Sequence, residues 1–452
     1  MDENKSTGME ECEIRHKHRS AKEEKDLISR LNRIEGQVRG VKAMVQDERY
    51  CTDILVQVSA IQSALNGFSR TLLSSHVKSC VVEEIKNGER TKKPPIPFTT
   101  STMQQEASKA LNFSTQKTMR VAQQLYEGVD VKGHGTIGLI TYLRTDSTRV
   151  AEEADKTARA FIEEQYGSQY VSQRESEKKA SGKIQDAHEA IRPTNIALTP
   201  TQVKESLSRD QFRLYQLIWK RFAASRMAAA VYETTSVKIG AEGVQFTMTA
   251  SRVKFDGFMS VYMEADDKEE KNQLLAKLEK GQELELVSLE DAQHFTQPPA
   301  HYTEASLVKA MEEQGIGRPS TYAPTITTIL ARRYVVKENK NIYVTEIGEV
   351  VNRSMKQCFP SIVDIAFTAN LEYLLDSVGE GLTPWKTIVR NFYPDLMEAV
   401  EEAQRTLETV HIADEESDEI CELCGRRMVI KYGPHRKFLA CPGFPECRNT
   451  KP

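Results

Sequence analysis

Four cysteines near the C-terminus restrict the fold of this chain more than any other feature of its sequence. Two residues separate Cys421 from Cys424, sixteen separate Cys424 from Cys441, and five separate Cys441 from Cys447. Two close pairs of thiolates match the ligand spacing of a tetrahedral Zn²⁺ site. Because four sulfur ligands leave no coordination position open for a substrate, the sequence predicts a structural zinc ribbon over residues 421–452.

Aromatic and basic residues surround these cysteines. Such a mixture suits stacking on the bases of a single strand together with contact to its phosphates. The same side chains also suit the small core of a ribbon, and for Phe438 the sequence leaves both interpretations open. The residues concerned are Tyr432, Arg436, Lys437, Phe438 and Phe444.

The charge of the whole chain does not indicate nucleic-acid binding. The 452 residues include 61 Lys and Arg against 65 Asp and Glu, a net charge of -4, so any nucleic-acid surface must be a local patch. A chain of this length is expected to hold roughly two to four domains. It has no apolar run of about 18 residues and no apolar signal core at its N-terminus. We therefore expect no membrane partner and a cytoplasmic location.

Apolar residues near the N-terminus follow a heptad pattern. Spacings of four and three alternate from Leu27 to Val45, and the pattern resumes from Ile54 to Leu72. It predicts helices with one continuous apolar seam, extending to about Lys86. The prolines of residues 92–97 are incompatible with a helix or a central strand, so we place a domain junction there.

The rest of the chain predicts a mainly α fold with a smaller β component. Helical patterns dominate, whereas residues 236–289 contain alternating stretches typical of strands. The predicted divisions are a disordered tail over 1–20, a helical module over 21–90, a junction over 91–98, a helical domain over 99–227, a strand-containing domain over 228–296, a second helical domain over 297–411, an acidic linker over 412–420 and the ribbon over 421–452.

A tyrosine and an arginine interrupt the apolar run GLITYLRTDS at residues 138–147. If this run is extended, Tyr142 and Arg144 point to the same side. A neutral tyrosine is a weak nucleophile, and an arginine can assist it by gripping the phosphate under attack and favouring the developing charge. The residues alone fit equally a buried tyrosine with a satisfied hydroxyl.

GLITYLRTDS resembles the nucleophile motif of the bacterial type IA DNA topoisomerases. Other segments resemble the same family, in the family's order, so that the resemblance covers about residues 92–452. These segments are 97–107, 118–127, 185–193, 297–306 and 315–322, and the four-cysteine ribbon resembles the family's C-terminal zinc modules.

The resemblance implies that Tyr142 forms a covalent 5′-phosphotyrosine link to single-stranded DNA, with Arg144 beside it and His188 assisting near the scissile phosphate. It also implies helical domains with a partial β arch. We expect no use of ATP, because the segment at Gly315 lacks the Gly-Lys-Ser/Thr ending of a phosphate-binding loop. The further residues implied to bind DNA are Asp146, Arg192, Arg318, Ser320 and Thr321.

Members of this family resemble one another in an N-terminal Toprim domain that holds Mg²⁺ on clustered acidic residues. No acidic motif of that type occurs in this sequence, so we expect the first part of the enzyme to be missing here. Metal-assisted chemistry needs divalent charge beside the phosphate. We therefore expect this chain to relax supercoiled DNA poorly.

The N-terminal module resembles a different family. RLNRIEGQVRG at residues 30–40, together with Cys51, His76 and Cys80, resembles the CsoR family of metal-sensing transcriptional repressors, which implies a helical hairpin. Two thiolates and one imidazole suit a soft ion such as Cu(I). Tyr50 matches a tyrosine just outside the metal ligands of the copper-sensing members. The third helix of these repressors is interrupted here by the proline-rich junction.

The proposed copper ligands imply a homodimer. In one helix over residues 51–80, Cys51 and His76 would be roughly 37 Å apart and could not share an ion. Antiparallel helices from two chains would bring Cys51 of one chain beside His76 and Cys80 of the other, the latter two lying one turn apart. The alternative is that the three residues simply fill a helical seam.

Three hypotheses for the whole chain follow. The first is an enzyme that cleaves DNA through Tyr142. The second is a Cu(I)-responsive repressor with a topoisomerase-derived extension, and the third is a non-functional fusion of two truncated parts. In the second, a basic patch would face DNA, although a solvated basic face is the alternative, and its residues are Arg30, Arg33, Arg39 and Lys42.

Overall fold

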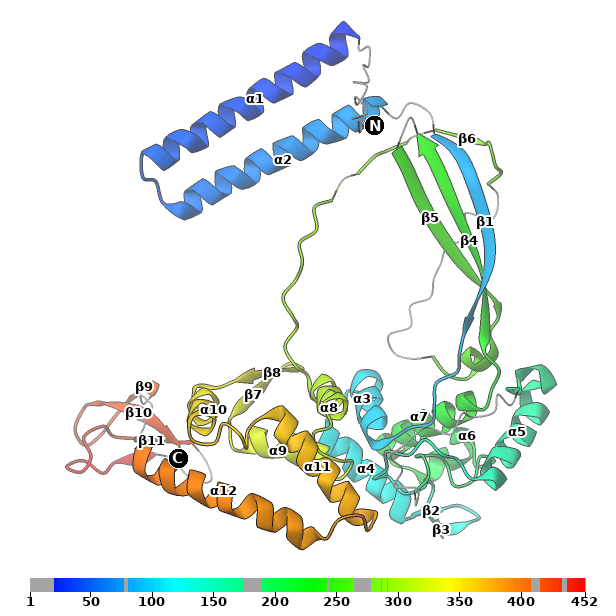
Figure 1. Cartoon of the computed structure of the whole chain (residues 1–452), viewed down its shortest axis with the longest axis vertical. Coiled ribbons are helices and arrows are strands. Elements are labelled where there is room, and N and C mark those ends of the chain that lie inside the picture. The colour runs from blue at the N-terminus through cyan, green and yellow to red at the C-terminus, as the bar shows by residue number, and fades with distance from the viewer. Residues whose placement is uncertain are drawn as a thin grey trace, which may run out of the picture. The chain divides into compact units, whose positions relative to one another are not determined.

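The computed structural model describes residues 20–76, 80–173, 188–241, 244–263, 278–285, 287–290, 292–407, 415–432 and 437–451 (Figure 1). The chain divides into two compact units. Unit 1 comprises Met1–Lys92, Val231–Phe255 and Lys268–Pro298, and unit 2 comprises Lys93–Ala230, Asp256–Asp267 and Pro299–Pro452. Within the described ranges, none of the helices combines the length and the apolar character needed to cross a lipid bilayer.

Unit 1 begins with a hairpin of two long helices, α1 (Ala21–Gln46) and α2 (Cys51–His76). The Ser20 hydroxyl accepts a hydrogen bond from the Glu23 amide, and the Glu23 carboxylate accepts one from the Ser20 amide. This capping box satisfies amides that the first turn of a helix leaves unpaired. α2 then returns alongside α1 (Figure 1).

The hairpin buries only part of the predicted heptad seam. Leu27, Ile34 and Ile61 are buried, whereas Val38 and Val45 are 50% and 59% exposed. Two packed helices cover only one stripe on each other. An apolar face of the hairpin is therefore left exposed among the described residues.

Unit 1 also contains a four-stranded sheet in the order β5-β4-β1-β6, three of whose strands are long (Figure 1). β4 and β5 pair antiparallel from Val231 and Phe255 to Ala241 and Val244. Val82, Val237 and Ala250 form the core on one face. The strands are β1 (Cys80–Lys92), β4 (Ala230–Ala241), β5 (Val244–Phe255) and β6 (Glu283–Leu284).

One prediction for unit 1 is wrong and another is confirmed. The helix predicted to reach about Lys86 is wrong, because α2 ends at His76 and Cys80 is the first residue of β1, paired with Leu284. The β-branched residues that follow Cys80 favour a strand once a sheet edge is available. The strands predicted within residues 236–289 are confirmed by β4, β5 and β6.

Helices dominate the first part of unit 2, as predicted for residues 99–227. Phe98, Leu125, Leu143, Tyr215 and Phe222 lie in its core. The elements are α3 (Thr100–Leu111), α4 (Thr115–Glu127), β2 (Val129–Val131), β3 (Gly135–Ile137), α5 (Glu152–Tyr166), η1 (Ser168–Tyr170), α6 (Pro200–Val203), η2 (Lys204–Ser206), α7 (Arg209–Ser225) and η3 (Gly257–Ser260).

The second part of unit 2 is also helical, as predicted, and Glu304 joins it to the first. The carboxylate of Glu304 accepts hydrogen bonds from the Thr115 amide (2.7 Å) and the Lys337 ammonium (2.6 Å). Burial alone would raise the pKa of Glu304, but these partners hold that pKa below its ordinary value. The elements are α8 (Glu304–Glu313), α9 (Tyr322–Ala331), β7 (Val335–Glu338), β8 (Asn341–Val344), α10 (Glu346–Cys358), α11 (Ile365–Gly379) and α12 (Trp385–Thr406).

The C-terminal part forms a small sheet in the order β12-β11-β10-β9. The linker predicted over residues 412–420 is wrong for residues 415–420, which form β9 and pair with β10. The acidic charge of this edge strand is met in part by Lys451, whose ammonium lies 3.0 Å from the Glu419 carboxylate. The strands are β9 (Glu415–Ile420), β10 (Arg427–Tyr432), β11 (Lys437–Ala440) and β12 (Thr450–Lys451).

Candidate active site and metal centre

Hydrogen bonds to residues 190–194 hold the chain just before Tyr142. The Thr141 hydroxyl donates to the Ala190 carbonyl (2.7 Å), and the Thr141 amide donates to the Arg192 carbonyl (2.9 Å). The Thr194 amide donates in turn to the Leu139 carbonyl (3.0 Å). The approach to Tyr142 is therefore fixed by a segment about fifty residues further along the chain.

A single hydroxyl holds the chain just after Tyr142. The Thr100 hydroxyl, in the first turn of α3, donates to the Leu143 carbonyl (2.7 Å) and accepts from the Thr145 amide (2.9 Å). The Thr100 amide also donates to the Thr145 carbonyl (2.9 Å). All of these groups are buried, so water does not compete for them.

Burial alternates along the segment. Leu143 and Thr145 are buried, Tyr142 is half-buried, and Arg144 and Asp146 are exposed. Bends at residues 141, 143 and 144 interrupt the run, so it is not a regular extended strand, and a shared side for Tyr142 and Arg144 stays a prediction. Among the described residues, Arg144 forms no ion pair.

The Tyr142 ring lies between two other rings. Its centroid is 5.6 Å from that of Tyr126, edge to face, and 4.9 Å from that of His188, at 29° between the planes. Within the described part of the chain, the Tyr142 hydroxyl has no hydrogen-bond partner. The alternative of a fully buried tyrosine with a satisfied hydroxyl therefore does not describe this site.

The Arg192 side chain forms hydrogen bonds within the fold. Its Nε donates to the Glu189 carboxylate (2.8 Å) and its Nη1 to the Pro193 carbonyl (3.0 Å), and the side chain is 11% exposed. Burial alone would raise the pKa of Glu189, but Arg192 and the Ala151 amide hold that pKa below its ordinary value. DNA contact by Arg192 stays a prediction. His188 is exposed, while residues 185–187 of its motif lie outside the described residues.

The second predicted DNA-contacting segment lies at the start of α9. Ser320 and Thr321 are exposed, and the Thr321 hydroxyl accepts a hydrogen bond from the Arg318 amide (2.8 Å). The Arg318 guanidinium pairs with Asp376 (2.6 Å) and lies 3.8 Å from Glu372, both in α11. Arg318 would have to exchange these carboxylates for a phosphate in order to bind DNA.

Tyr322 connects this segment to the tyrosine segment. Burial, together with the charges of Glu312 and Asp146, raises the pKa of Tyr322 to about 12. The contribution of Asp146 to this shift links Tyr322 electrostatically to the tyrosine segment. The Ser101 hydroxyl of α3 donates to Glu312 of α8 (2.6 Å) and joins these two helices.

The four predicted zinc ligands converge. The sulfurs of Cys421, Cys424, Cys441 and Cys447 all lie within 4.8 Å of one another, with Cys421 and Cys447 at 3.6 Å and Cys424 and Cys441 at 3.2 Å. Sulfurs around a tetrahedral Zn²⁺ at about 2.3 Å are separated by about 3.8 Å. The donor set and its spacing therefore fit a zinc ion.

The thiols differ in their surroundings. A hydrogen bond from the Asn449 amide lowers the pKa of Cys421 to about 6. The Gly443 amide lowers the pKa of Cys441, but burial and the neighbouring thiols outweigh it and raise that pKa to about 12. A bound dication would favour the thiolate form of both, since metal binding displaces thiol protons.

The aromatic residues of the ribbon have different environments. Phe438 is half-buried, so both interpretations of this side chain remain possible. Phe444 is 71% exposed, and the Arg448 guanidinium lies 5.9 Å from its ring centre. The side chains of Tyr432, Arg436 and Lys437 lie outside the described residues.

The predicted copper ligands are only partly described. Cys51 is exposed at the start of α2, and Tyr50 beside it is 74% exposed. The side chains of His76 and Cys80 lie outside the described residues, and their backbones belong to a helix end and a strand. The prediction that His76 and Cys80 lie one turn apart on a shared helix is therefore wrong.

The predicted basic patch lies on the exposed side of α1. Arg30 pairs with Asp26 and Arg39 with Glu35, each one helical turn away. Such exposed pairs contribute little to stability, but they offset part of the positive charge. The exposed members are Arg30, Arg33, Arg39 and Lys42.

Sequence reasoning missed Thr100 and Tyr126 as parts of the site. Thr100 lies in a run of hydroxyl residues at 99–102, and its partners are 43 and 45 residues away. Tyr126 reaches the site from the end of α4. No local pattern marks either residue, because both roles depend on long-range packing.

Comparisons with known proteins agree with this geometry. The DNA topoisomerase family model matches residues 62–390, and the model of the topoisomerase DNA binding C4 zinc finger matches residues 418–452. Full-length topoisomerase I from Thermotoga maritima is 38% identical, with a TM-score of 0.66, over 84% of this chain and 61% of that chain.

The DNA topoisomerase model covers more than half of the chain, and the ribbon matches a zinc finger module of topoisomerases. The chain belongs to the DNA topoisomerase family. It spans about 61% of the length of the Thermotoga maritima enzyme. The matched region begins at residue 62, upstream of the junction predicted at residues 91–98.

Proposed function

We propose that this chain cleaves and rejoins single-stranded DNA through Tyr142 without using ATP. The phenolic oxygen attacks the scissile phosphorus, an O–P bond forms, and the bond from phosphorus to the 3′ oxygen breaks. The phenol loses a proton and the 3′ oxygen gains one. In the return step the 3′ hydroxyl attacks the 5′-phosphotyrosine. One phosphodiester replaces another, so no external energy is required.

The placement of the Tyr142 ring carries this proposal. The ring is half-buried and stacked against His188. Hydrogen bonds of Thr100 and Thr141 hold the backbone on both sides of it. A nucleophile on a fixed segment loses little freedom when it reaches the reactive geometry. The exposed guanidinium of Arg144 is suited to grip the phosphate and offset its developing charge.

We propose that His188 assists the reaction at the scissile phosphate or at the 3′ oxygen. Its ring faces the phenol ring at 4.9 Å, an arrangement in which its nitrogens do not point at the Tyr142 hydroxyl. We further propose that Asp146, Arg192, Arg318, Ser320 and Thr321 contact the DNA around this point. Arg192 and Arg318 would do so by exchanging their present carboxylate partners for phosphate.

A trapping experiment tests the proposal. The full chain is incubated with a single-stranded oligonucleotide labelled at either end and then denatured. A 5′-phosphotyrosine keeps the 3′ label on the protein and releases the 5′ label with a free 3′ hydroxyl. Tyr142→Phe should give no adduct, whereas Tyr126→Phe should still give one. An adduct that persists in Tyr142→Phe would contradict the assignment.

We also propose that Mg²⁺ on clustered acidic residues is needed for efficient turnover. The sequence contains no motif of that type. Among the described residues, the only grouping of metal-binding side chains is the four cysteines. Turnover by this chain alone should therefore be impaired, and cleavage should be easier to detect than relaxation.

A second candidate function concerns the N-terminal hairpin. The exposed apolar face of α1 and α2 favours association with a second copy, which would bury Val38 and Val45. We propose that such a dimer binds Cu(I) through Cys51 of one chain and His76 of the other, as in CsoR-type repressors, with Tyr50 nearby and with Cys80 supplied from the start of β1 instead of from the helix of His76. The third possibility is that neither part of the chain is functional.

Copper titration separates these possibilities. Binding of one Cu(I) per chain, lost in Cys51→Ala but kept in Cys358→Ala, would support the sensor. Cys358 is a matched control because it is a free cysteine of α10, in unit 2, and not a residue of the hairpin. Failure of both the copper titration and the trapping experiment would leave the non-functional fusion.

A further inference from the structure

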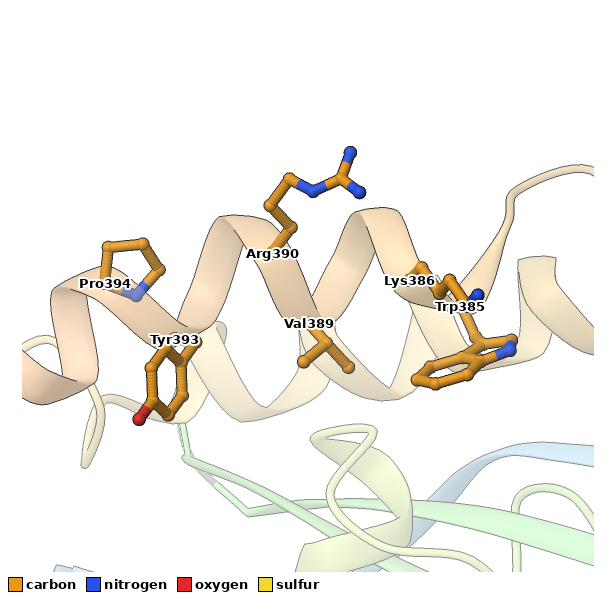
Figure 2. Close-up of a pocket in the computed structure, with 6 residues that line it drawn as sticks. All are labelled: Trp385, Lys386, Val389, Arg390, Tyr393 and Pro394. Atoms are coloured by element: carbon orange, nitrogen blue, oxygen red, sulfur yellow. The ribbon is translucent and has the colours of Figure 1, made fainter.

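Helix α12 carries an exposed groove that no described residue covers (Figure 2). One side of the groove is formed by Trp385, Val389 and Tyr393, at spacings of four residues. The other side is formed by Lys386, Arg390 and Pro394, one position further on. Figure 2 shows the first set pointing to one side of the helix and Arg390 to the other.

The first ridge is unusually apolar for a surface. Trp385, Val389 and Tyr393 are 58%, 50% and 57% exposed. The side of the helix that packs adjoins this ridge: Ile388 is buried, and the Phe392 ring lies 5.8 Å from that of Phe367. The ridge therefore does not contribute to the core of unit 2.

The second ridge carries positive charge. Lys386 and Arg390 have no carboxylate within ion-pair distance among the described residues. The Lys386 ammonium lies 5.8 Å from the centre of the Trp385 ring. No acidic side chain lines the groove, and the acidic residues of α12 begin at Asp395, beyond it.

The spacing of the rings suits a nucleic acid strand. Tyr393 follows Trp385 by eight positions of helix, which places them about 12 Å apart along the axis. Stacked bases rise about 3.4 Å each, and a stretched strand rises more. The groove therefore spans about two to four nucleotides.

We propose that the α12 groove binds single-stranded DNA, with bases on Trp385 and Tyr393 and phosphates along Lys386 and Arg390. Rings beside cations are the usual basis of single-strand binding without sequence preference. A protein partner would require only the apolar ridge and leave the two cations unexplained. In the sequence, α12 is followed by the ribbon matched by the DNA binding C4 zinc finger.

Fluorescence of the full chain tests this proposal. The chain has two tryptophans, and Trp219 is buried in α7, so Trp385 is the one accessible to a ligand. An oligothymidylate of about twelve nucleotides should quench this emission, and the quench should vanish in Trp385→Phe. Trp385→Ala and Tyr393→Ala should each weaken binding roughly tenfold. Tyr373→Ala, an equally exposed aromatic next to Glu372 in α11, serves as the control.

Salt dependence tests the phosphate contacts. Each lost contact to a single strand should reduce the slope of log Kd against log salt by about 0.7, so Lys386→Glu with Arg390→Glu should reduce it by about 1.4. A quench that is unchanged in Trp385→Phe would overturn the proposal. A concentration-dependent change in Trp385 emission without DNA, together with no response to oligothymidylate, would identify a second copy as the occupant.

The test is independent of cleavage. Tyr142→Phe should keep the full quench, because the α12 groove contains no reacting group. If trapping fails while the quench is observed, only the proposed cleavage is wrong. If the quench fails while trapping succeeds, only the groove assignment is wrong.

Discussion

At the scale of single residues, Thr100 accounts for how an irregular segment can hold Tyr142, the nucleophile that we propose. Its hydroxyl bridges the Leu143 carbonyl and the Thr145 amide, so the backbone on the far side of Tyr142 cannot rotate freely. Thr100 does not touch the reacting atoms and is a positioning residue. Its effect on the reaction must act through Tyr142 and Arg144.

Removing the Thr100 hydroxyl should slow adduct formation without unfolding the chain. Thr100→Val keeps the shape but leaves a buried carbonyl and amide without their partner, which costs about 1–3 kcal/mol. We expect a loss of rate on the order of tenfold to a hundredfold, since small misplacements of reacting groups have effects of that size. The measurement is the initial rate of oligonucleotide trapping.

Two further variants make the Thr100 result specific. Thr100→Ser should restore most of the rate, because the hydroxyl returns. Thr157→Val removes a comparable threonine hydroxyl from α5, where it donates to the Glu153 carbonyl, and should leave the rate unchanged. Equal rates in Thr100→Val and the unmodified chain would rule out the positioning role.

The residues that sequence could identify are those whose chemistry depends on local spacing. The four zinc cysteines and the pair Tyr142 and Arg144 stand at fixed short intervals. The structure brings the four sulfurs together, and the roles of Tyr142 and Arg144 stay predictions. Thr100 and Tyr126 could not be found in that way, because only the folded chain brings them to the site.

At the scale of elements, prediction failed where tertiary pairing overrides local pattern. We expected helix as far as about residue 86, yet residues 80–86 form β1 because β6 and the other strands of the sheet offer backbone partners. The acidic residues 415–420 likewise form β9 against β10. The long helices of unit 2 and strands β4 and β5 were predictable, since their periodicity agrees with the final packing.

Glu304 makes the joint between the two parts of unit 2 sensitive to pH. Its pKa is lower in the fold than the ordinary value of 4.5. Its stabilising contribution is therefore present above about pH 4.5 and is lost as the pH falls through the lower, folded value. Glu304→Gln should reduce the free energy of unfolding by roughly 2 kcal/mol at neutral pH.

Thermal unfolding at several pH values checks the Glu304 prediction. The stability difference between the unmodified chain and Glu304→Gln should shrink as the pH drops below about 4.5. Glu313→Gln changes an exposed glutamate at the end of the same helix and should show no such trend. A difference that stays constant down to pH 3 would exclude the linkage.

The ribbon should depend on its metal. Structural zinc sites of this kind contribute about 10–16 kcal/mol of apparent binding free energy, which becomes folding free energy for a small module. Cys441→Ser should abolish binding of one Zn²⁺ per chain. It should also make the amides of β10 and β11 exchange their hydrogens faster. Cys358→Ser, outside the cluster, should change neither. Full protection of the ribbon after chelation would contradict the structural role.

At the scale of the whole molecule, sequence motifs identified the family of most of the chain. They did not settle the function of its N-terminal part. The tyrosine segment, the later DNA-contacting segment and the ribbon were predicted in order, and the family match agrees with them. The N-terminal hairpin is present as two helices, but its assignment to a metal sensor stays a prediction. Its apolar exposure is a property of the folded hairpin that heptad spacing alone does not reveal.

The absence of an acidic Mg²⁺ motif from the sequence leads to a prediction for the whole chain. With Mg²⁺ supplied, we predict that relaxation of a supercoiled plasmid is far slower than relaxation by a full-length type IA enzyme at equal concentration, because the sequence has no acidic motif of the family's type to hold divalent charge beside the phosphate. Tyr142→Phe sets the background of the assay. Turnover close to that of the full-length enzyme would show that this chain holds the metal by other residues.

The identity of the covalently linked residue tests the central claim most directly. After trapping with an oligonucleotide and digestion with nuclease and trypsin, the peptide at residues 133–144, GHGTIGLITYLR, contains Tyr142 as its single tyrosine. We predict that mass spectrometry finds a nucleotide joined through its 5′ phosphate on this peptide and on no other. A nucleotide on a different tyrosine, such as Tyr126, or one joined through a 3′ phosphate, would contradict the account.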